Sequence, residues 1–203
     1  MKSRILLLLW LVLPAAWAEP AADALATQVM ANEEWTGDLG KCPVDLFAAN
    51  RRQEYDRAIR NQCFAPSGQE ACMASCKAGQ GQHCYWLANA LQSAPQNKQA
   101  AEVLFQRACK LGIASGCTNR AAGMMAAPPT IVPVDSCEAR TFEQTCAADD
   151  AWGCSMYGFI LSRDKSAANH RERAIQALKK ACKYGADDPA CASSSSLIKE
   201  LSR

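Results

Sequence analysis

The sequence predicts an all-α fold: an α/α superhelix of about three to four disulfide-linked helical hairpins. Two observations carry this prediction. Short segments closed by a cysteine at each end, such as "CKAGQGQHC" (76–84) and "CKLGIASGC" (109–117), return every thirty-odd residues. Between them, apolar and small residues recur at helical spacing, and a period of this size is typical of stacked helical hairpins.

The start of the chain, residues 1–18, predicts a secretory signal peptide. "MKSRILLLLWLVLPAAWA" opens with two basic residues, continues with an apolar run from Ile5 to Leu13, and ends with small residues around the cleavage position. The alternative is a transmembrane anchor, which needs about 20 apolar residues, and this run is shorter. We therefore expect cleavage after Ala18 and a periplasmic or secreted protein that keeps no membrane anchor.

The charge of the chain argues against two classes of partner. It has 22 lysines and arginines against 20 aspartates and glutamates, and two of the basic residues belong to the leader. The mature protein is therefore close to neutral, which gives no electrostatic case for binding nucleic acid or an acidic membrane surface. Its length of roughly 185 residues suits one domain or one short repeat array.

The cysteines indicate a disulfide framework rather than a metal or redox site. All 12 lie after the leader, and an even number in an exported chain is typical of crosslinks. No C-x-x-C occurs, and the only histidines, His83 and His170, have no finger-like spacing, so we expect no metal and no cofactor. The cysteines are Cys42, Cys63, Cys72, Cys76, Cys84, Cys109, Cys117, Cys137, Cys146, Cys154, Cys182 and Cys191.

Aligning the chain on the cysteine pairs gives a repeat of two helices, A and B. The first cysteines of successive pairs are 33, 37 and 36 residues apart. Positions four and seven after the second cysteine share one face of helix A, and positions four and one before the first cysteine form the buried stripe of helix B. The helix A positions hold Ala88, Ala121 and Gly158, then Leu91, Met124 and Leu161, and the helix B positions hold Phe105, Phe142 and Leu178, then Ala108, Thr145 and Ala181.

Each disulfide is expected to join the end of one helix B to the start of the next helix A. A glycine soon after the first cysteine, as in Gly79, Gly112 and Gly185, fits a helix C-terminal cap. A single hairpin cannot bury its own apolar face, so the stacking of hairpins creates the core. A crosslink over about nine residues adds roughly 2.6 kcal/mol to the free energy of unfolding by loop entropy. The expected pairs are Cys76–Cys84, Cys109–Cys117, Cys146–Cys154 and Cys182–Cys191.

Two stretches of this repeat resemble a known family. "HCYWLANAL" followed by "AAEVLFQRACKLGIASGC", and "CSMYGFIL" followed by "RAIQALKKACKYG", are similar to Sel-like repeats, relatives of the tetratricopeptide repeat, in their cysteine-rich exported (Hcp-like) class. The resemblance covers Cys63 to Arg203 and implies an α/α superhelix that acts mainly as a protein-binding scaffold. Some members bind penicillin or weakly hydrolyse β-lactams, which gives an enzymatic alternative.

The loops between helices A and B depart from the family, because the usual glycine-rich loop is missing from every copy. They read "QSAPQNK", "AAPPTIVPVDS" and "SRDKSAANHRE". The proline-rich second loop predicts a helix that ends near Met125 and an extended run to about Val134. Ile131 and Val132 lie there either in a loose loop or on an apolar edge available to a partner.

Residues 19–62 fit the repeat less well and form a separate N-terminal part. Residues 19–40 are expected to be a short helix or a tail, and Trp35 either a capping contact for the first hairpin or an exposed anchor. Between positions 43 and 63 one or two helices are expected, with Leu46, Tyr55 and Ile59 inward. The outward arginines, read as a solvated face in preference to an anion site, are Arg51, Arg52, Arg57 and Arg60.

The remaining cysteines are paired by analogy and by elimination. "CFAPSGQEAC" resembles the last junction, which pairs Cys63 with Cys72. Cys42 and Cys137 are then left for each other, a crosslink that would tie the N-terminal part back onto the second repeat.

The sequence offers little support for catalysis. "SRDK" (162–165) matches the S-x-x-K motif of penicillin-interacting enzymes, but no S-D-N or K-T-G accompanies it. No other catalytic motif is present, and His83, at a helix start, is expected to be a capping or surface residue rather than a ligand. We therefore expect no catalytic residues.

The expected function is a non-catalytic, monomeric scaffold in the bacterial periplasm that binds another protein, whose identity the sequence leaves open. The alternatives are an immunity-type protein that neutralises a periplasm-delivered effector, and a β-lactam-binding or weakly β-lactamase-like enzyme. Helices A usually line the concave side of such arrays, and aromatic, arginine and asparagine side chains there are typical of a binding hot spot. Tyr85 and Trp86 could instead simply pack between repeats. The expected partner-binding residues, off the buried stripe, are Tyr85, Trp86, Asn89, Asn119, Arg120, Met156 and Tyr157.

Overall fold

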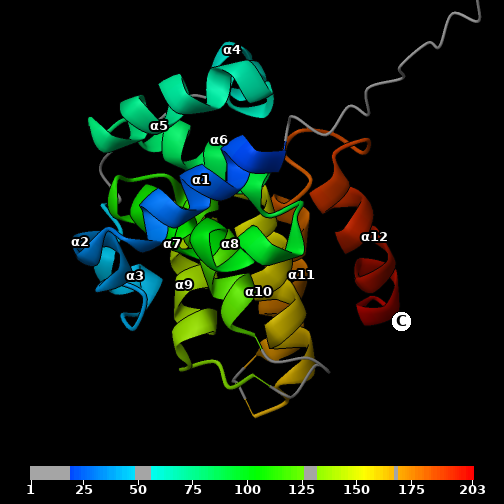
Figure 1. The fold of residues 1–203 in the computed structure, drawn as a ribbon. Helices are drawn as coiled ribbons and strands as arrows, with labels where there is room; N and C mark the ends of the chain where they lie inside the picture. The colour runs from blue at the N-terminus through cyan, green and yellow to red at the C-terminus, as the bar shows by residue number, and fades with distance from the viewer. Residues whose placement is uncertain (1–18, 49–55, 126–131, 167–168) are drawn as a thin grey trace, which may run out of the picture.

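The computed structural model describes residues 19–48, 56–125, 132–166 and 169–203, and within these ranges the chain is all-helical without a strand (Figure 1). The predicted all-α class is confirmed. The leader (1–18), Arg51, Arg52, Tyr55 and Ile131 lie outside the described residues. No helix in the described ranges has the length and apolar character needed to cross a bilayer.

Helices that follow one another in the chain pack against one another from α4 to α12, and we call this part the array. Four pairs correspond to helices A and B of the repeat, and α12 is a final helix A that packs on both α10 and α11. The array consists of α4 (Arg57–Phe64) and α5 (Gln69–Lys77), α6 (Gly81–Leu91) and α7 (Lys98–Lys110), α8 (Ala114–Met124) and α9 (Cys137–Ala147), α10 (Ala151–Arg163) and α11 (His170–Lys180), and α12 (Pro189–Leu201).

The turns between hairpins share one backbone conformation. The residue three after the first cysteine has a positive φ in all four turns: 85° at Gly79, 90° at Gly112, 67° at Asp149 and 105° at Gly185. This left-handed residue ends the helix as a Schellman cap, in which the next N–H reaches back to a carbonyl of the last helical turn. In the first three turns these bonds run from Gln80 to Ser75, from Ile113 to Ala108 and from Asp150 to Thr145, at 3.1, 3.0 and 2.9 Å.

The predicted buried stripe forms the core. Phe105, Phe142 and Leu178 are at most 2% exposed, and Ala108, Thr145 and Ala181 are fully buried. On helices A the expected small and apolar positions are also buried, except Met124, which is only partly buried near the end of α8. At Gly158 a Cβ atom would lie 2.6 Å from Leu178 Cγ, so α10 and α11 approach too closely there for any side chain.

Six disulfides crosslink the described chain, and they are the six pairs that the sequence predicts. One of them lies within a hairpin and not at a junction between hairpins. Cys63–Cys72 joins the two helices of the first hairpin, α4 and α5, rather than two successive hairpins. The α4–α5 connection is a single 3-10 turn at Pro66–Gly68, and the α6–α7 connection repeats it at Pro95–Asn97.

Helices α1 (Glu19–Met30), α2 (Glu33–Thr36) and α3 (Pro43–Leu46) lie across the array (Figure 1). The end of the expected N-terminal part, from Arg57, belongs to α4 and so to the array, and from here on we use N-terminal part for residues 19–46. All three helices contact α7, and α3 also contacts α8 and α9. Residues 19–30 are therefore a helix and not a tail. Trp35 is 4% exposed, belongs to the first core cluster and lies beside Arg107 of α7, so it is a capping contact for the α6–α7 hairpin and not an exposed anchor. Leu46 and Ile59 are partly buried, and Arg57 and Arg60 are exposed, as the sequence predicts.

Candidate functional site

Helices α6 and α8 bring three of the expected partner-binding residues together around one hydroxyl group. The Tyr85 hydroxyl hydrogen-bonds with Asn89, Asn119 and Ser115, and lies close to the charge of Asp150. Burial raises the pKa of Tyr85 and the Asp150 carboxylate adds to this rise, while the three hydrogen bonds oppose it. Tyr85 therefore stays a neutral phenol at physiological pH and fixes α6 against α8.

Asp150 holds this polar group at the α9–α10 turn. One carboxylate oxygen accepts hydrogen bonds from the Gly153 N–H at 2.6 Å and the Thr118 hydroxyl at 2.9 Å, and the other accepts one from the Ser115 hydroxyl. Its bond to Gly153 makes Asp150 the N-cap residue of α10, because it pairs a backbone N–H that the helix cannot pair internally. The polar group is thus part of a hydrogen-bonded junction between two repeats.

Trp86 belongs to an aromatic cluster that joins α4 and α6. Its ring centroid is 6.2 Å from that of Phe64 and 4.7 Å from that of Tyr85. The Arg60 guanidinium lies 5.3 Å from the Phe64 ring centroid and 5.9 Å from that of Trp86. Phe64 is 44% exposed, while Tyr85 and Trp86 are partly buried against the first core cluster. Tyr85 and Trp86 therefore pack between helices of the array, as the alternative interpretation of the sequence has it, and each stays partly exposed.

Arg120 is not on this surface, contrary to the sequence-based expectation. Its guanidinium donates to the Glu102 carboxylate on α7 at 3.0 Å and to the Leu39 carbonyl at 3.0 Å, and its side chain is 13% exposed. Burial raises the pKa of Glu102, and the charges of Arg120 and Lys98 only partly offset this rise. Arg120 therefore supports the fold, where it compensates a carboxylate that has lost much of its hydration.

Tyr157 also lies elsewhere, because α11 covers it. It is 8% exposed in the second core cluster, and its hydroxyl donates to the Glu143 carboxylate at 2.6 Å and accepts from Arg173. Burial, together with the hydrogen bond and charge of Glu143, raises the pKa of Tyr157 to about 12, and Arg173 acts in the opposite direction. Met156 is partly buried against the same cluster. The expectation that Tyr157 lies off the buried stripe is wrong.

The residues considered for catalysis or ligation have other roles. Ser162 lies in the last turn of α10 and donates to the Phe159 carbonyl at 2.6 Å, which occupies its hydroxyl proton, while Lys165 is exposed in the following loop. His83 is 8% exposed, so it is a buried residue and not a surface or capping one, and burial lowers its pKa against an opposing effect of Asp56. In the described ranges no three His, Cys, Asp or Glu side chains are grouped as metal ligands.

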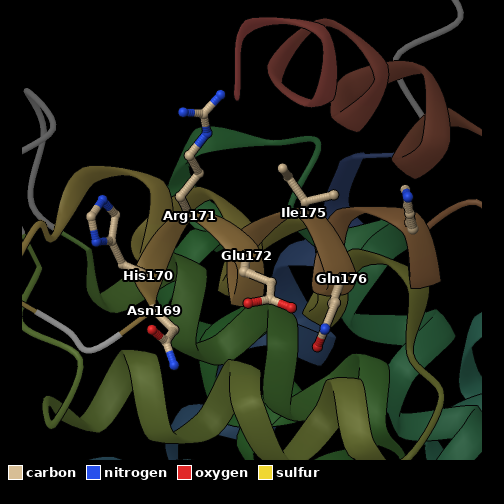
Figure 2. Close-up of a pocket in the computed structure, with 7 residues that line it drawn as sticks. Asn169, His170, Arg171, Glu172, Ile175 and Gln176 are labelled. Carbon is tan, nitrogen blue, oxygen red and sulfur yellow. The ribbon is translucent and has the colours of Figure 1, made fainter. Parts of the chain in front are cut away.

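One face of α11 forms an open depression beside α12 (Figure 2). Figure 2 shows Ile175 directed toward α12, and the Arg171 guanidinium donates to the Leu201 carbonyl at 2.5 Å. Because all of its lining comes from one helix and the residue before it, the depression cannot surround a small molecule. The lining residues are Asn169, His170, Arg171, Glu172, Ile175, Gln176 and Lys179.

The exposed part of the site is therefore smaller than the sequence suggests and includes two residues that sequence reasoning missed. The sequence predicts a solvated face for Arg60 and assigns no role to Phe64. Their spacing of four residues on α4 places them on one face, which is the signal that could have identified them. Comparison with protein-family models, with curated proteins and with solved structures finds no match to this chain.

Proposed function

We propose that the protein is a non-catalytic scaffold of Sel-like repeats that works in the bacterial periplasm and binds another protein through its α4–α6 surface. The observation that carries this proposal is the cluster of Arg60, Phe64 and Trp86, in which a 44%-exposed phenylalanine lies beside a guanidinium and a partly buried tryptophan. Tryptophan and arginine are enriched among the residues that dominate protein–protein binding energy.

The chemistry of this surface indicates what it would bind. Arg57, Arg60 and Phe64 follow one another at helical spacing along α4, and none of the ion pairs found among the described residues involves either arginine. The two rings beside Arg60 hold its guanidinium and leave its N–H groups for an anion. The complementary surface is a carboxylate next to an apolar side chain on the partner.

The compartment is supported by the crosslinks and the leader. No cysteine in the described part of the chain is free, and six disulfides indicate an oxidising environment. A signal peptide directs the chain to such an environment in a bacterium. The resemblance of residues 63–203 to exported Sel-like repeats supports a scaffold, because proteins of that class act mainly by holding other proteins.

The proposal is tested by quantitative affinity capture from periplasmic extract with the wild-type protein and two variants. Arg60→Gln with Phe64→Ala removes the charge and the exposed ring, and Tyr184→Ala removes an aromatic side chain that is 68% exposed elsewhere. We expect a protein captured by the wild type and by Tyr184→Ala to fall at least tenfold with the double variant, at unchanged melting temperature. Equal capture by all three proteins would show that the α4–α6 surface does not bind it.

A further inference from the structure

The array holds one stretch of its own chain as it would hold a bound peptide. We call residues 33–46 the clasp segment, and the five side chains that receive it the clasp site. These side chains reach the segment from three helices, and their positions lie 65 to 95 residues away in sequence from the partners that they bind. The clasp site consists of Gln106, Arg107 and Lys110 on α7, Arg120 on α8 and Arg140 on α9.

Two of the five side chains bind main-chain carbonyls of the clasp segment. The fully buried Gln106 amide donates to the Asp38 carbonyl at 3.1 Å and to the Lys41 carbonyl at 3.2 Å. Arg120 donates to the Leu39 carbonyl at 3.0 Å. Bonds of this kind recognise the main chain of any segment, and proteins that bind short peptides commonly use them.

The other three side chains form ion pairs with acidic residues of the clasp segment. Arg107 pairs with Glu34 at 3.0 Å, Lys110 with Asp38 at 2.8 Å and Arg140 with Asp45 at 2.6 Å. The Arg107 guanidinium also lies 5.5 Å from the ring centroid of the buried Trp35. The clasp site is therefore complementary to a segment with spaced carboxylates and one tryptophan anchor.

The clasp segment does not satisfy all the polar atoms of the site. Four buried side-chain atoms among the described residues have no hydrogen-bond partner, and three of them belong to the clasp site: Gln106 Oε1, Arg107 Nε and Arg120 Nε. Buried polar atoms are paired in the large majority of cases, and each unpaired one costs roughly 1 to 3 kcal/mol. The clasp segment therefore leaves part of the polar surface of the site unpaired.

From these contacts we infer that the clasp site is a recognition site for an acidic segment of a partner protein, which the clasp segment occupies in cis. The Cys42–Cys137 disulfide tethers the clasp segment to α9, with a sequence separation of 95 residues. A tether of this kind gives a weakly bound segment an effective concentration of the order of millimolar, so a free competitor of equal affinity is excluded at lower concentration. This site is separate from the α4–α6 surface and does not depend on the proposed function.

The test releases the clasp segment and offers its sequence in trans. A full-length variant with Glu34→Gln, Asp38→Asn, Cys42→Ser and Asp45→Asn loses the tether and the three carboxylates, and leaves Cys137 as a free thiol. The probes are two synthetic peptides of residues 32–46, NEEWTGDLGKCPVDL and a matched control with Gln and Asn at the same three acidic positions. Each is incubated with the variant in a glutathione buffer, and disulfide capture at Cys137 is measured by mass spectrometry.

We expect the acidic peptide to be captured at least tenfold more than its control, while the far-ultraviolet circular dichroism of the variant stays native. Equal capture of the two peptides by the folded variant would overturn the inference. Should the four substitutions prevent folding, the same peptides are tested on Cys42→Ser with Asp45→Asn, which alters only partly or fully exposed groups. Equal capture there would overturn the inference as well.

Discussion

The array and the N-terminal part are held by different kinds of interaction. In the array, apolar stripes pack between neighbouring helices, and every crosslink spans eight or nine residues. The N-terminal part combines an apolar contact of α1 and Trp35 with long-range ion pairs and a single disulfide that spans 95 residues. The array is therefore a local structure that each repeat stabilises for its neighbour, while the clasp segment is an attachment to it.

The largest effect is expected from the crosslink between the two regions. Replacing both Cys42 and Cys137 by serine opens a crosslinked loop of nearly 100 residues. Loop entropy gives such a crosslink a contribution of about 4 to 5 kcal/mol to the free energy of unfolding. Urea unfolding followed by circular dichroism measures the change. A decrease of less than about 1 kcal/mol in the free energy of unfolding would show that tethering the clasp segment does not stabilise the folded chain.

Arg120→Ala is expected to rank second, because Arg120 serves both regions. The substitution leaves Glu102 largely buried without its cation and the Leu39 carbonyl without its donor. Breaking a buried ion pair costs about 3 kcal/mol or more, and this partly exposed pair is expected at that lower limit. Arg163→Ala, at an exposed position, is the matched control and should change the free energy of unfolding by less than about 0.5 kcal/mol. Equal effects of the two substitutions would contradict the assigned role.

Within the array, a central crosslink is expected to matter more than the last one. Replacing both Cys109 and Cys117 by serine removes a crosslink at a junction that has repeats on both sides. Loop entropy gives this crosslink a contribution of roughly 2.6 kcal/mol to the free energy of unfolding. The Cys182–Cys191 crosslink holds only α12, where fraying is inexpensive, so the same replacement there should lower the melting temperature less. Differential scanning calorimetry compares the melting temperatures of the two variants. A larger decrease without the Cys182–Cys191 crosslink would show that α12 is an essential cap of the array.

The smallest effect is expected on the clasp segment when the pH is lowered. Burial raises the pKa of Asp38, but hydrogen bonds and charge from Lys110 and Lys41 outweigh it and hold the pKa below its ordinary value of 3.8. A depressed carboxyl pKa stabilises the folded state above the ordinary value, and this stabilisation is lost as the pH falls through the folded-state pKa. The clasp segment should thus loosen below pH 3.8 before the array does, visible as pepsin cleavage within residues 33–46. Asp38→Asn should weaken the pH dependence, because the contribution of this carboxyl group is then absent at every pH, and a wild-type segment that stays protected at pH 2 would contradict the prediction.

The sequence predicts the array well because its information is local. Cysteine spacing fixes the junctions, and helical periodicity fixes the stripe that contains Phe105, Phe142 and Leu178. The chain even shows where glycine can be replaced, since Asp149 takes the left-handed position that Gly79 and Gly112 occupy. Aspartate tolerates this conformation better than most residues.

The clasp site could not be predicted, because its contacts depend on tertiary packing. Gln106 stands in the same helical turn as the stripe residue Phe105, and only the arrival of residues 38–41 gives its amide a partner. Arg120 and Tyr157 each sit three residues after a cysteine, and their surroundings depend on helices α7 and α11 rather than on spacing along their own helix. Elimination alone identified Cys42–Cys137, since periodicity does not relate two residues so far apart.

Native-state hydrogen exchange of the wild-type protein tests the distinction between array and attachment most directly. We expect the backbone amides of residues 38–42 and 44–46 to exchange through openings at least tenfold more frequent than those that expose Leu87 on α6 and Leu104 on α7, both fully buried. Openings of equal free energy in the two regions, with the same dependence on denaturant, would show one cooperative unit. The clasp segment would then be part of the core and not a docked segment.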